Sequence, residues 1–359
     1  MNSLLRILRR IPVPFWCYFL PMLASAAGWI PRSHPAYSLL SEQLLPICLV
    51  FLLLGTDLAS MAALGRKALL VMLAGSAGTV IGALVSFFLY RAWLPAGAWG
   101  AVGALSASWI GGSANLLAIK EALQVPDSLI GPIVVVDAAV AYSWMALLIA
   151  SAGLQEKWVW RGVMPETDGE TARRTSHESG TSRSARNLAL GIGLGLAVSW
   201  AAQSLAQRLP AIGQVITAPT WTVLLVTTFA LLLSGTAART LGQGALPRLG
   251  ILALYVLLAS IGARADLTAV TAAPIFLALG VTWIAIHGAV LLLAGYLLRA
   301  PLGLIATASQ ANIGGPISAP IVGATFSPRL ATAGLLMAIL GNILGTYLGL
   351  LTALLLRQL

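Results

Sequence analysis

Long apolar runs, interrupted by a few polar residues, dominate the chain. A helix that crosses the hydrocarbon core of a bilayer needs about 20 predominantly apolar residues. By that criterion the pattern predicts eleven helical segments, at about 14–30, 37–56, 67–92, 97–123, 128–152, 188–206, 214–237, 247–263, 272–298, 300–325 and 329–356. We therefore predict an all-α membrane protein with about 10–12 transmembrane helices.

One stretch between these runs has a different composition. Residues 155–187 are rich in serine, threonine, glycine and arginine, and they also hold several acidic residues. Such a composition cannot bury enough apolar surface to fold on a core, so it predicts a solvated loop. The chain is thereby divided into a first membrane repeat at 1–154, the solvated loop at 155–187 and a second membrane repeat at 188–359.

The overall composition supports a membrane protein and argues against other classes. Only 9% of the residues are charged and 58% are hydrophobic, whereas soluble domains carry about a quarter charged residues. The net charge of +10 fits Lys and Arg in cytoplasmic loops beside anionic lipid, so we expect no nucleic-acid partner. The sequence carries no motif of a nucleophilic, phosphate-binding or metal-dependent enzyme, so we expect neither enzymatic activity nor an organic cofactor.

The two halves share an ordered set of polar features. The set comprises Gly111-Gly112, Asp137 and Tyr142 in the first half, and Gly314-Gly315, Asn342 and Tyr347 in the second. In both halves the polar residue precedes the tyrosine by the same interval. We therefore predict an internal repeat.

Whether this repeat is inverted depends on how many segments cross the membrane. Inverted repeats are common in secondary transporters, and they require an odd number of crossings between equivalent segments. Eleven complete crossings would make the repeats parallel and would divide Lys and Arg almost evenly between the two sides. If 97–123 or its neighbour crosses once more or once less, the repeats become inverted and the basic residues gather on one side, as expected for the cytoplasm. We therefore expect an inverted repeat, without assigning the miscounted segment.

The first glycine pair, Gly111-Gly112, interrupts an apolar run and is followed by Ser113 and Asn115. Paired glycines weaken a helix and free backbone groups that lipid cannot satisfy, so such a break is tolerated where it lines a cavity. An exposed helix N-terminus there can hold an anion, and unwound carbonyls can hold a cation. The alternative is a close helix-packing site built on small residues.

The second glycine pair is richer in polar neighbours. The candidate site residues around it are Ser309, Gln310, Asn312, Gly314, Gly315, Pro316 and Ser318. Pro316 suits the first turn of a helix that restarts after the break. We predict that both breaks contribute to one substrate or ion site.

Asp137 is the acidic residue of the apolar segment 128–152. An ionisable group at membrane depth is a functional hypothesis by default, because it can bind a proton or a cation. We expect Asp137, with Asn342 as its equivalent, to couple transport to an ion; a structural carboxyl bonded to a helix break or a lysine is the alternative. Secondary candidates are Lys120, Tyr142 and Tyr347. For Lys120 we favour an extended side chain that reaches the membrane surface over a pair with Asp137.

Over nearly its whole length the chain resembles the YjcL-like family of uncharacterised integral membrane proteins, a domain-of-unknown-function family. Its motifs at 111–115 and 310–312 are more distantly similar to the crossover motifs of the bile acid:sodium symporter family, within the cation/proton antiporter superfamily. That resemblance implies two broken helices that cross at mid-membrane, and a core domain that moves against a panel domain. It also places Ser113, Asn115 and Gln310 in a cation-binding region.

The chain departs from the symporter pattern at Ala306, where the symporters carry an acid, so both H⁺ and Na⁺ stay open as coupling ions. Together these features predict a secondary active transporter of a small organic solute, with an anion preferred, in the bacterial inner membrane. The metal candidate is Na⁺, near Ser113, Asn115, Asp137 and Gln310. The expected partners are the solute, the bilayer and, as one option, a second copy of the chain. A non-transporting scaffold or receptor, and a channel, are the alternatives.

Overall fold

The computed structural model describes residues 13–58, 64–158, 184–212, 216–264 and 273–359. These residues are overwhelmingly helical, and no named strand occurs among them. The helices are α2 (Val13–Ala26), α3 (Pro35–Leu39), α4 (Leu45–Leu53), α5 (Gly65–Tyr90), α6 (Ala98–Gly111), α7 (Ser113–Ala122), α8 (Asp127–Ala150), α10 (Ser184–Ala206), α11 (Ala218–Ser234), α12 (Leu246–Arg264), α13 (Ala273–Leu297), α14 (Leu302–Ile313), α15 (Gly315–Phe326) and α16 (Pro328–Leu356). A π-helical turn at Leu40–Leu44 joins α3 to α4.

All eleven apolar segments are therefore helical where the structure describes them. Seven stretches there are long and apolar enough to cross a bilayer: Pro35–Leu53, Gly65–Tyr90, Asp127–Lys157, Ala185–Ala206, Leu246–Arg264, Ala273–Leu297 and Arg329–Leu356. Two shorter apolar helices lie at Trp16–Ala26 and Ala218–Ser234. The predicted segments 97–123 and 300–325 are each divided into two short helices. Most of the predicted loop at 155–187 lies outside the described residues.

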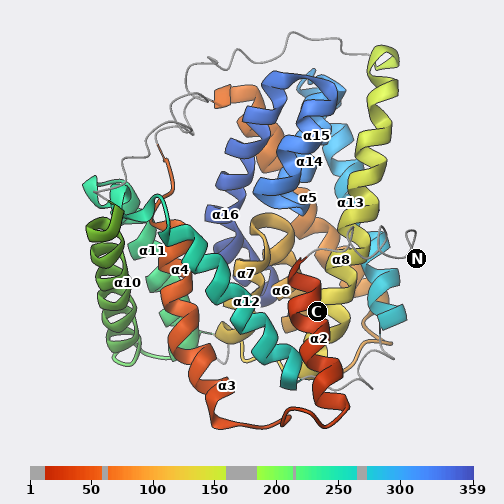
Figure 1. Ribbon diagram of the computed structural model, residues 1–359. Coiled ribbons are helices and arrows are strands. Elements are labelled where there is room, and N and C mark those ends of the chain that lie inside the picture. Colours follow the sequence, from red (N-terminus) through yellow and green to blue (C-terminus); the bar gives the residue numbers. More distant parts are fainter. Residues whose placement is uncertain (1–12, 59–63, 159–183, 213–215, 265–272) are drawn as a thin grey trace, which may run out of the picture.

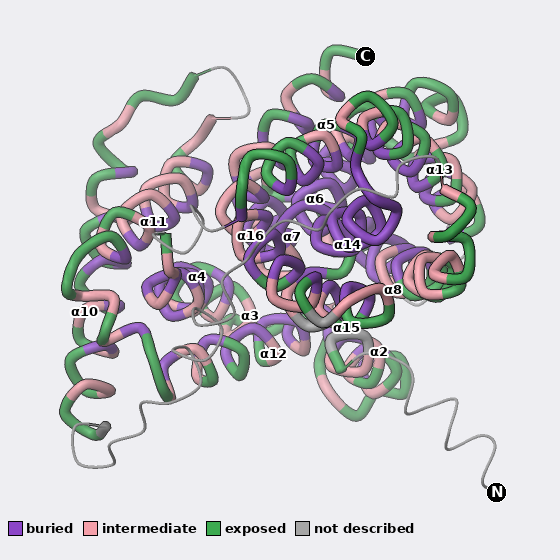
Figure 2. The backbone as a smooth tube through the Cα atoms, turned by 90° about the horizontal axis from the view of Figure 1, so that it is seen from above, coloured by how far each residue is buried: buried purple, intermediate pink, exposed green. Residues whose placement is uncertain are grey.

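The helices form two groups (Figure 1). α4, α10, α11 and α12 pack on one another, with α2 along α12, and we call this group the panel. α5, α6, α7, α8, α13, α14, α15 and α16 form the other group, the core. Seen from above, α6 and α14 lie in the most deeply buried part of the core (Figure 2), and all residues of α14 are buried.

The direction of each helix follows from contacts at the two ends of the bundle. Lys67 Nζ, near the start of α5, donates a 3.2 Å hydrogen bond to the carbonyl of Arg299, just after α13. Arg91, just after α5, donates to the carbonyl of Leu359 at the C-terminus. We call these the Lys67 end and the Arg91 end. The long helices α5 and α13 pack side by side and run antiparallel between the two ends.

The segment 98–122 does not pass from one end to the other. A methyl group on Gly100, near the start of α6, would lie 3.0 Å from Val125, just after α7. Two helices in line would separate these residues by tens of ångströms, at 1.5 Å per residue. α6 and α7 are therefore a hairpin that enters the core from the Arg91 end and returns to it. The broken helix that the symporter resemblance implied was expected to cross the membrane, and that expectation is wrong here.

The segment 302–326 has the same form at the opposite end. A methyl group on Gly303 would lie 2.8 Å from Phe326 Cβ, so the first residues of α14 meet the last residues of α15. Ala300, just before α14, accepts a hydrogen bond from Trp158, which places this hairpin at the Lys67 end. The second predicted crossing is therefore also a hairpin.

Contacts with α16 bring the two hairpins together. α16 begins beside the second hairpin at the Lys67 end and runs antiparallel to α6. Along this pair Ala107 lies against Gly349 and Gly111 against Gly345, with glycines allowing the backbones to approach closely. The turn of the first hairpin therefore lies beside the middle of α16. The two hairpins enter the core from opposite ends.

Candidate functional site

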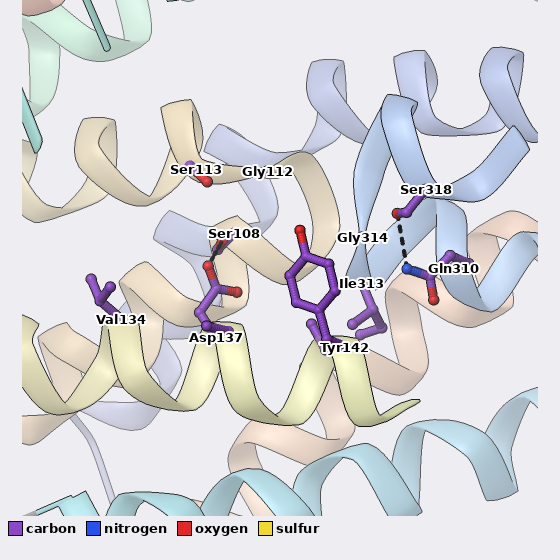
Figure 3. Close-up of a pocket in the computed structure, with 12 residues that line it drawn as sticks. Ser108, Gly112, Ser113, Val134, Asp137, Tyr142, Gln310, Ile313, Gly314 and Ser318 are labelled. Atoms are coloured by element: carbon purple, nitrogen blue, oxygen red, sulfur yellow. Dashed lines mark hydrogen bonds between the residues drawn. The ribbon is translucent and has the colours of Figure 1, made fainter. Parts of the chain in front are cut away.

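The turns of the two hairpins and one face of α8 enclose a cavity of about 100 Å³. Its lining residues are Ser108, Gly112, Ser113, Val134, Asp137, Ala138, Ala141, Tyr142, Gln310, Ile313, Gly314 and Ser318. Figure 3 shows the labelled side chains of these residues around the cavity. The predicted residues Gly112, Ser113, Asp137, Gln310 and Ser318 are thus brought to one place from three separate parts of the chain.

The first turn of the cavity wall is made by Gly112. Its φ of 82° lies in the left-handed region, where a residue with a side chain is strained. Its carbonyl accepts hydrogen bonds from the amides of Asn115 and Leu116, so α7 restarts directly after it. Ser113, the first residue of α7, therefore lies at the cavity, and the positive N-terminal end of α7 faces the same space.

The second turn is shaped by Gly314. A methyl group there would overlap Gln310 Nε2 and Ser318 Oγ, so a glycine leaves the room in which these two side chains meet. Gln310 Nε2 donates a 2.9 Å hydrogen bond to Ser318 Oγ. Gln310 Oε1 accepts no hydrogen bond, although the residue is only 1% exposed. A buried acceptor without a partner is an open position for a ligand or an ion.

Asp137 enters from α8 and is held by the first hairpin. Trp109 Nε1 donates a 3.0 Å hydrogen bond to Oδ1, and Ser108 Oγ donates a 3.2 Å bond to Oδ2. Trp109 is fully buried against Trp283, with ring centroids 4.7 Å apart. No ion pair to Asp137 occurs among the described residues, so its carboxylate is oriented by neutral donors and keeps acceptor capacity for a further group.

Tyr142 lies one turn beyond Asp137 on α8. Its side chain is 46% exposed and it lines the cavity. In Figure 3 the ring stands between Asp137 on one side and Gln310 on the other. Tyr142, a secondary candidate of the sequence analysis, therefore borders the cavity at its exposed edge.

Asn115 lies beside the cavity but does not line it. Its Nδ2 donates to the carbonyl oxygens of Gly111 at 2.6 Å and Asn342 at 3.3 Å, and its Oδ1 accepts from Thr346. These bonds use both amide protons and also engage the oxygen. Asn115 therefore satisfies the carbonyl freed by the break and ties the hairpin to α16. Asn342, the predicted equivalent of Asp137, adjoins this turn through its carbonyl, and its Oδ1 would lie 3.7 Å from a methyl group on Gly112.

Asn312 has a comparable structural environment on the second hairpin. It is fully buried, and its Nδ2 lies within hydrogen-bond distance of the carbonyls of Ala308 and Met72. Its Oδ1 accepts a 2.8 Å hydrogen bond from Ser76 of α5. The side chain therefore fastens α14 to α5, and the structure places it away from the cavity.

Ser309 belongs to a separate buried chain of hydrogen bonds. It accepts a 2.8 Å bond from Trp144 Nε1 and lies 3.0 Å from His287 Nε2. His287 Nδ1 lies 3.1 Å from Thr79 Oγ1 on α5. Thr79 in turn donates to a backbone carbonyl of its own helix. This chain links α8, α14, α13 and α5, and Ser309 is not among the residues that line the cavity.

Lys120 is buried in an ionic cluster at the Arg91 end. Its Nζ lies 2.6 Å from Glu121 Oε1 and 2.9 Å from Asp127 Oδ1, and the residue is 4% exposed. Arg264 of α12 lies 3.2 Å from Asp127 Oδ2 and donates to Ser41. The expectation that Lys120 reaches the membrane surface is therefore wrong, because two carboxylates in the protein hold its ammonium group.

The remaining candidates have packing roles. Gly111 is buried against Gly341 and Gly345 of α16. Gly315 has a φ of 72° and opens α15, with Pro316 in its first turn. Tyr347 lies 2.9 Å from Thr228 of α11, between core and panel. None of these residues lines the cavity in the described part of the chain.

The sequence analysis did not predict Ser108 and Trp109 as hydrogen-bond donors to the Asp137 carboxylate. Both directly precede the predicted break, and an indole N–H inside an apolar run requires a partner. That requirement was the available signal. The four apolar lining residues carried no signal, because alanine, valine and isoleucine occur throughout the chain.

Comparisons with known proteins relate the chain to membrane proteins of unknown function. A family model described as "Protein of unknown function (DUF819)" matches residues 3–359. The uncharacterized membrane protein YjcL of Bacillus subtilis (strain 168) is 28% identical over 357 residues, which covers 91% of this chain and 86% of that protein. The similarity to the bile acid:sodium symporters stays a prediction. The chain is an integral, multi-pass membrane protein and belongs to the DUF819 family.

Proposed function

We propose that this protein is a secondary active transporter, in which the cavity between the hairpin turns binds a small organic solute. The observation that carries the proposal is the meeting of two broken-helix turns and one half-buried carboxylate, Asp137, at a single cavity. Transporters commonly bind substrate near mid-membrane between such broken helices. Asp137 is the residue that we expect to bind H⁺ or Na⁺ as the coupling ion.

The directions of the helices support an inverted repeat. Five helices, α8, α10, α11, α12 and α13, separate the two hairpins along the chain. An odd number of crossings reverses the second hairpin relative to the first, which agrees with their entry from opposite ends. Two halves of opposite orientation give a central site comparable routes to either side of a membrane.

Basic residues support a cytoplasmic position for the Lys67 end. Among the described residues, those that we assign to this end from helix direction are Arg66, Lys67, Lys157, Arg186, Arg239, Arg248, Arg299 and Arg329. At the other end Lys120 and Arg264 have acidic neighbours in the ionic cluster, and at the Lys67 end Arg239 has one in Asp57. An excess of Lys and Arg marks cytoplasmic loops. We therefore propose an inner-membrane protein whose Lys67 end faces the cytoplasm.

The dimensions and lining of the cavity support a small solute. Pockets for drug-sized molecules measure about 300–1,000 Å³, whereas this one measures about 100 Å³. Ser113, which begins α7, and Gly314, which directly precedes α15, line the cavity, and helix N-terminal ends favour a negatively charged group. A small organic solute with an anionic group fits both observations.

Alternating access requires the core to move against the panel. The ionic cluster joins Lys120 of the first hairpin and Asp127 of α8, both in the core, to Arg264 of the panel at the Arg91 end. We propose that this cluster holds the Arg91 end together in the state described here. Opening that end would require the bond between Asp127 and Arg264 to break.

Trp109 offers a direct test, because its indole donates to Asp137. Purified protein in liposomes would be exposed to pH steps and Na⁺ steps while tryptophan fluorescence is followed. We expect the fluorescence of the wild type to change on these steps, and we expect both Asp137→Asn and Trp109→Phe to remove the change. Trp200 is an exposed tryptophan of α10, so Trp200→Phe is the matched control and should leave the change intact.

Transport itself would be measured as charge movement on solid-supported membranes during jumps of candidate solutes, with and without Na⁺. Currents that persist unchanged in Asp137→Asn would remove Asp137 from the mechanism. A fluorescence response without any solute flux would favour a receptor. Solute flux that ignores both ion gradients would favour a channel.

A further inference from the structure

The cavity has two chemically different poles, and this bears on the substrate. We propose, on the basis of the transport function above, that the solute is a small zwitterion with a primary ammonium group, of the size of the smallest amino acids. Its ammonium would bind Asp137 and Gln310 Oε1, and its carboxylate would lie at the N-terminal ends of α7 and α15.

The cationic pole follows from hydrogen-bond accounting at Gln310. Its amide nitrogen is bonded to Ser318, whereas its oxygen accepts nothing, although the residue is buried and lines the cavity. A buried acceptor requires a donor. A simple carboxylate ligand has no proton to donate. The ligand therefore needs an N–H or O–H donor for Gln310 Oε1, or a cation bound with the ligand must meet this oxygen.

Asp137 strengthens the same pole. Each of its two oxygens accepts one bond, from Trp109 and from Ser108. An ionised carboxylate has about four lone-pair positions, so each oxygen can accept another bond. An ammonium group carries three donors, enough to serve Asp137 and Gln310 together.

The anionic pole lies at the hairpin turns. Ser113 begins α7 and Gly314 directly precedes α15, and both residues line the cavity. The first amides of a helix have no partner within the helix and point toward its N-terminal end. A carboxylate between the two turns would receive the free amides of α7, those of α15 other than at Pro316, which has no N–H, and the hydroxyl group of Ser113.

Charge balance distinguishes the zwitterion from other organic ions. The lining contains one carboxyl group and no Lys, Arg or His side chain within the described residues. A dicarboxylate would therefore meet Asp137 without a counter-charge. A zwitterion brings its own positive group to the acid, which makes the occupied cavity compatible with its apolar surroundings.

Matched ligand pairs test the proposal. Thermal unfolding of the purified protein would be followed with glycine against acetate, and with β-alanine against propionate, each in Na⁺ buffer and in choline buffer. We expect the amino acids to raise Tm and the carboxylates of equal length to have no effect at the same concentration. Methylamine alone should also leave Tm unchanged, because it lacks the anionic group.

Four variants separate binding from folding. Gln310→Leu should weaken amino-acid binding about tenfold or more, the usual cost of losing a hydrogen bond to a charged group. Asp137→Asn should remove it. Gln203→Leu, on α10 and away from the cavity, is the matched control and should bind like the wild type. If Gln310→Leu does not fold, Ser113→Ala should weaken amino-acid binding from the anionic pole.

Equal stabilisation by the carboxylates would overturn the zwitterion. Carboxylate binding that appears only with Na⁺ would assign Gln310 Oε1 to the metal ion instead. In either of these cases the transporter proposal would still stand if carboxylates drive currents and Asp137→Asn abolishes those currents. Absence of any effect of the amino acids on Tm would also reject the zwitterion, and currents absent for all solutes would reject the transport function itself.

Discussion

Two regions of this protein hold half-buried carboxyl groups, and the neighbours of these groups differ. At the Arg91 end, Glu121 and Asp127 lie among Lys120 and Arg264, so each negative charge has a positive neighbour. In the central cavity Asp137 meets only the neutral donors of Ser108 and Trp109. In the ionic cluster the carboxylates are neutralised by basic side chains of the protein. In the cavity the carboxylate of Asp137 is left available to an ion or a solute.

The same contrast separates two amide side chains. Asn115 has both protons and its oxygen bonded to the protein. Gln310 has its nitrogen bonded and its oxygen free. Residue type and burial are therefore poor guides to function in this bundle. The number of unused hydrogen-bond positions is the better guide.

The largest effect on stability is expected at the ionic cluster. Lys120→Met leaves the carboxylates of Glu121 and Asp127 with only Arg264 nearby. Removing one member of a buried ion pair typically costs about 3–5 kcal/mol of unfolding free energy. Unfolding of the purified variant would measure it. Lys67→Met, at an exposed lysine that bonds a carbonyl, is the matched control and should change stability little. Similar losses in both variants would contradict the assignment of Lys120 to structure.

A smaller loss is expected from Asn115→Ala. It removes this donor from the carbonyl oxygens of Gly111 in the first turn and Asn342 in α16, and buried unpaired groups cost about 1–3 kcal/mol each. Gln310→Ala should lower the unfolding free energy by less, because one of its polar atoms is already unpaired. Equal stability of the two alanine variants, or a lower stability of Gln310→Ala, would contradict the distinction between a fully bonded Asn115 and a partly bonded Gln310.

Trp109→Phe should have an effect of about 1 kcal/mol. The phenyl ring keeps a buried contact with Trp283, but the N–H that orients Asp137 is lost. We also expect the variant to change the ion dependence of transport more than its stability. Wild-type ion dependence in this variant would show that the indole only packs.

The smallest effect on stability, and the largest on function, is expected from Asp137→Asn. An amide of nearly the same shape replaces a carboxylate that has no basic partner among the described residues, so unfolding free energy should change by less than about 1 kcal/mol. Coupled transport should disappear. A strong loss of stability would instead place Asp137 with the ionic cluster as a structural group.

The helical segments were predictable because apolar length and Gly-Gly breaks are local properties. The direction taken after a break was not. A segment such as 97–123 is long enough to cross a bilayer or to return as a hairpin, and the contact of Gly100 with Val125 distinguishes the two. The number of crossings between the two repeats predicted that one segment does not cross as counted. The structure shows hairpins at both 97–123 and 300–325.

The sequence alone determined that this chain lies in a membrane, where it breaks, and that Asp137 is an isolated acid in an apolar helix. These properties follow from composition and neighbours along the chain. Only the tertiary structure decided that Asn115 and Asn312 fasten helices while Gln310 keeps a free oxygen, and that Lys120 is paired. A polar side chain in an apolar bundle takes whatever partner packing brings to it, and that partner comes from another helix.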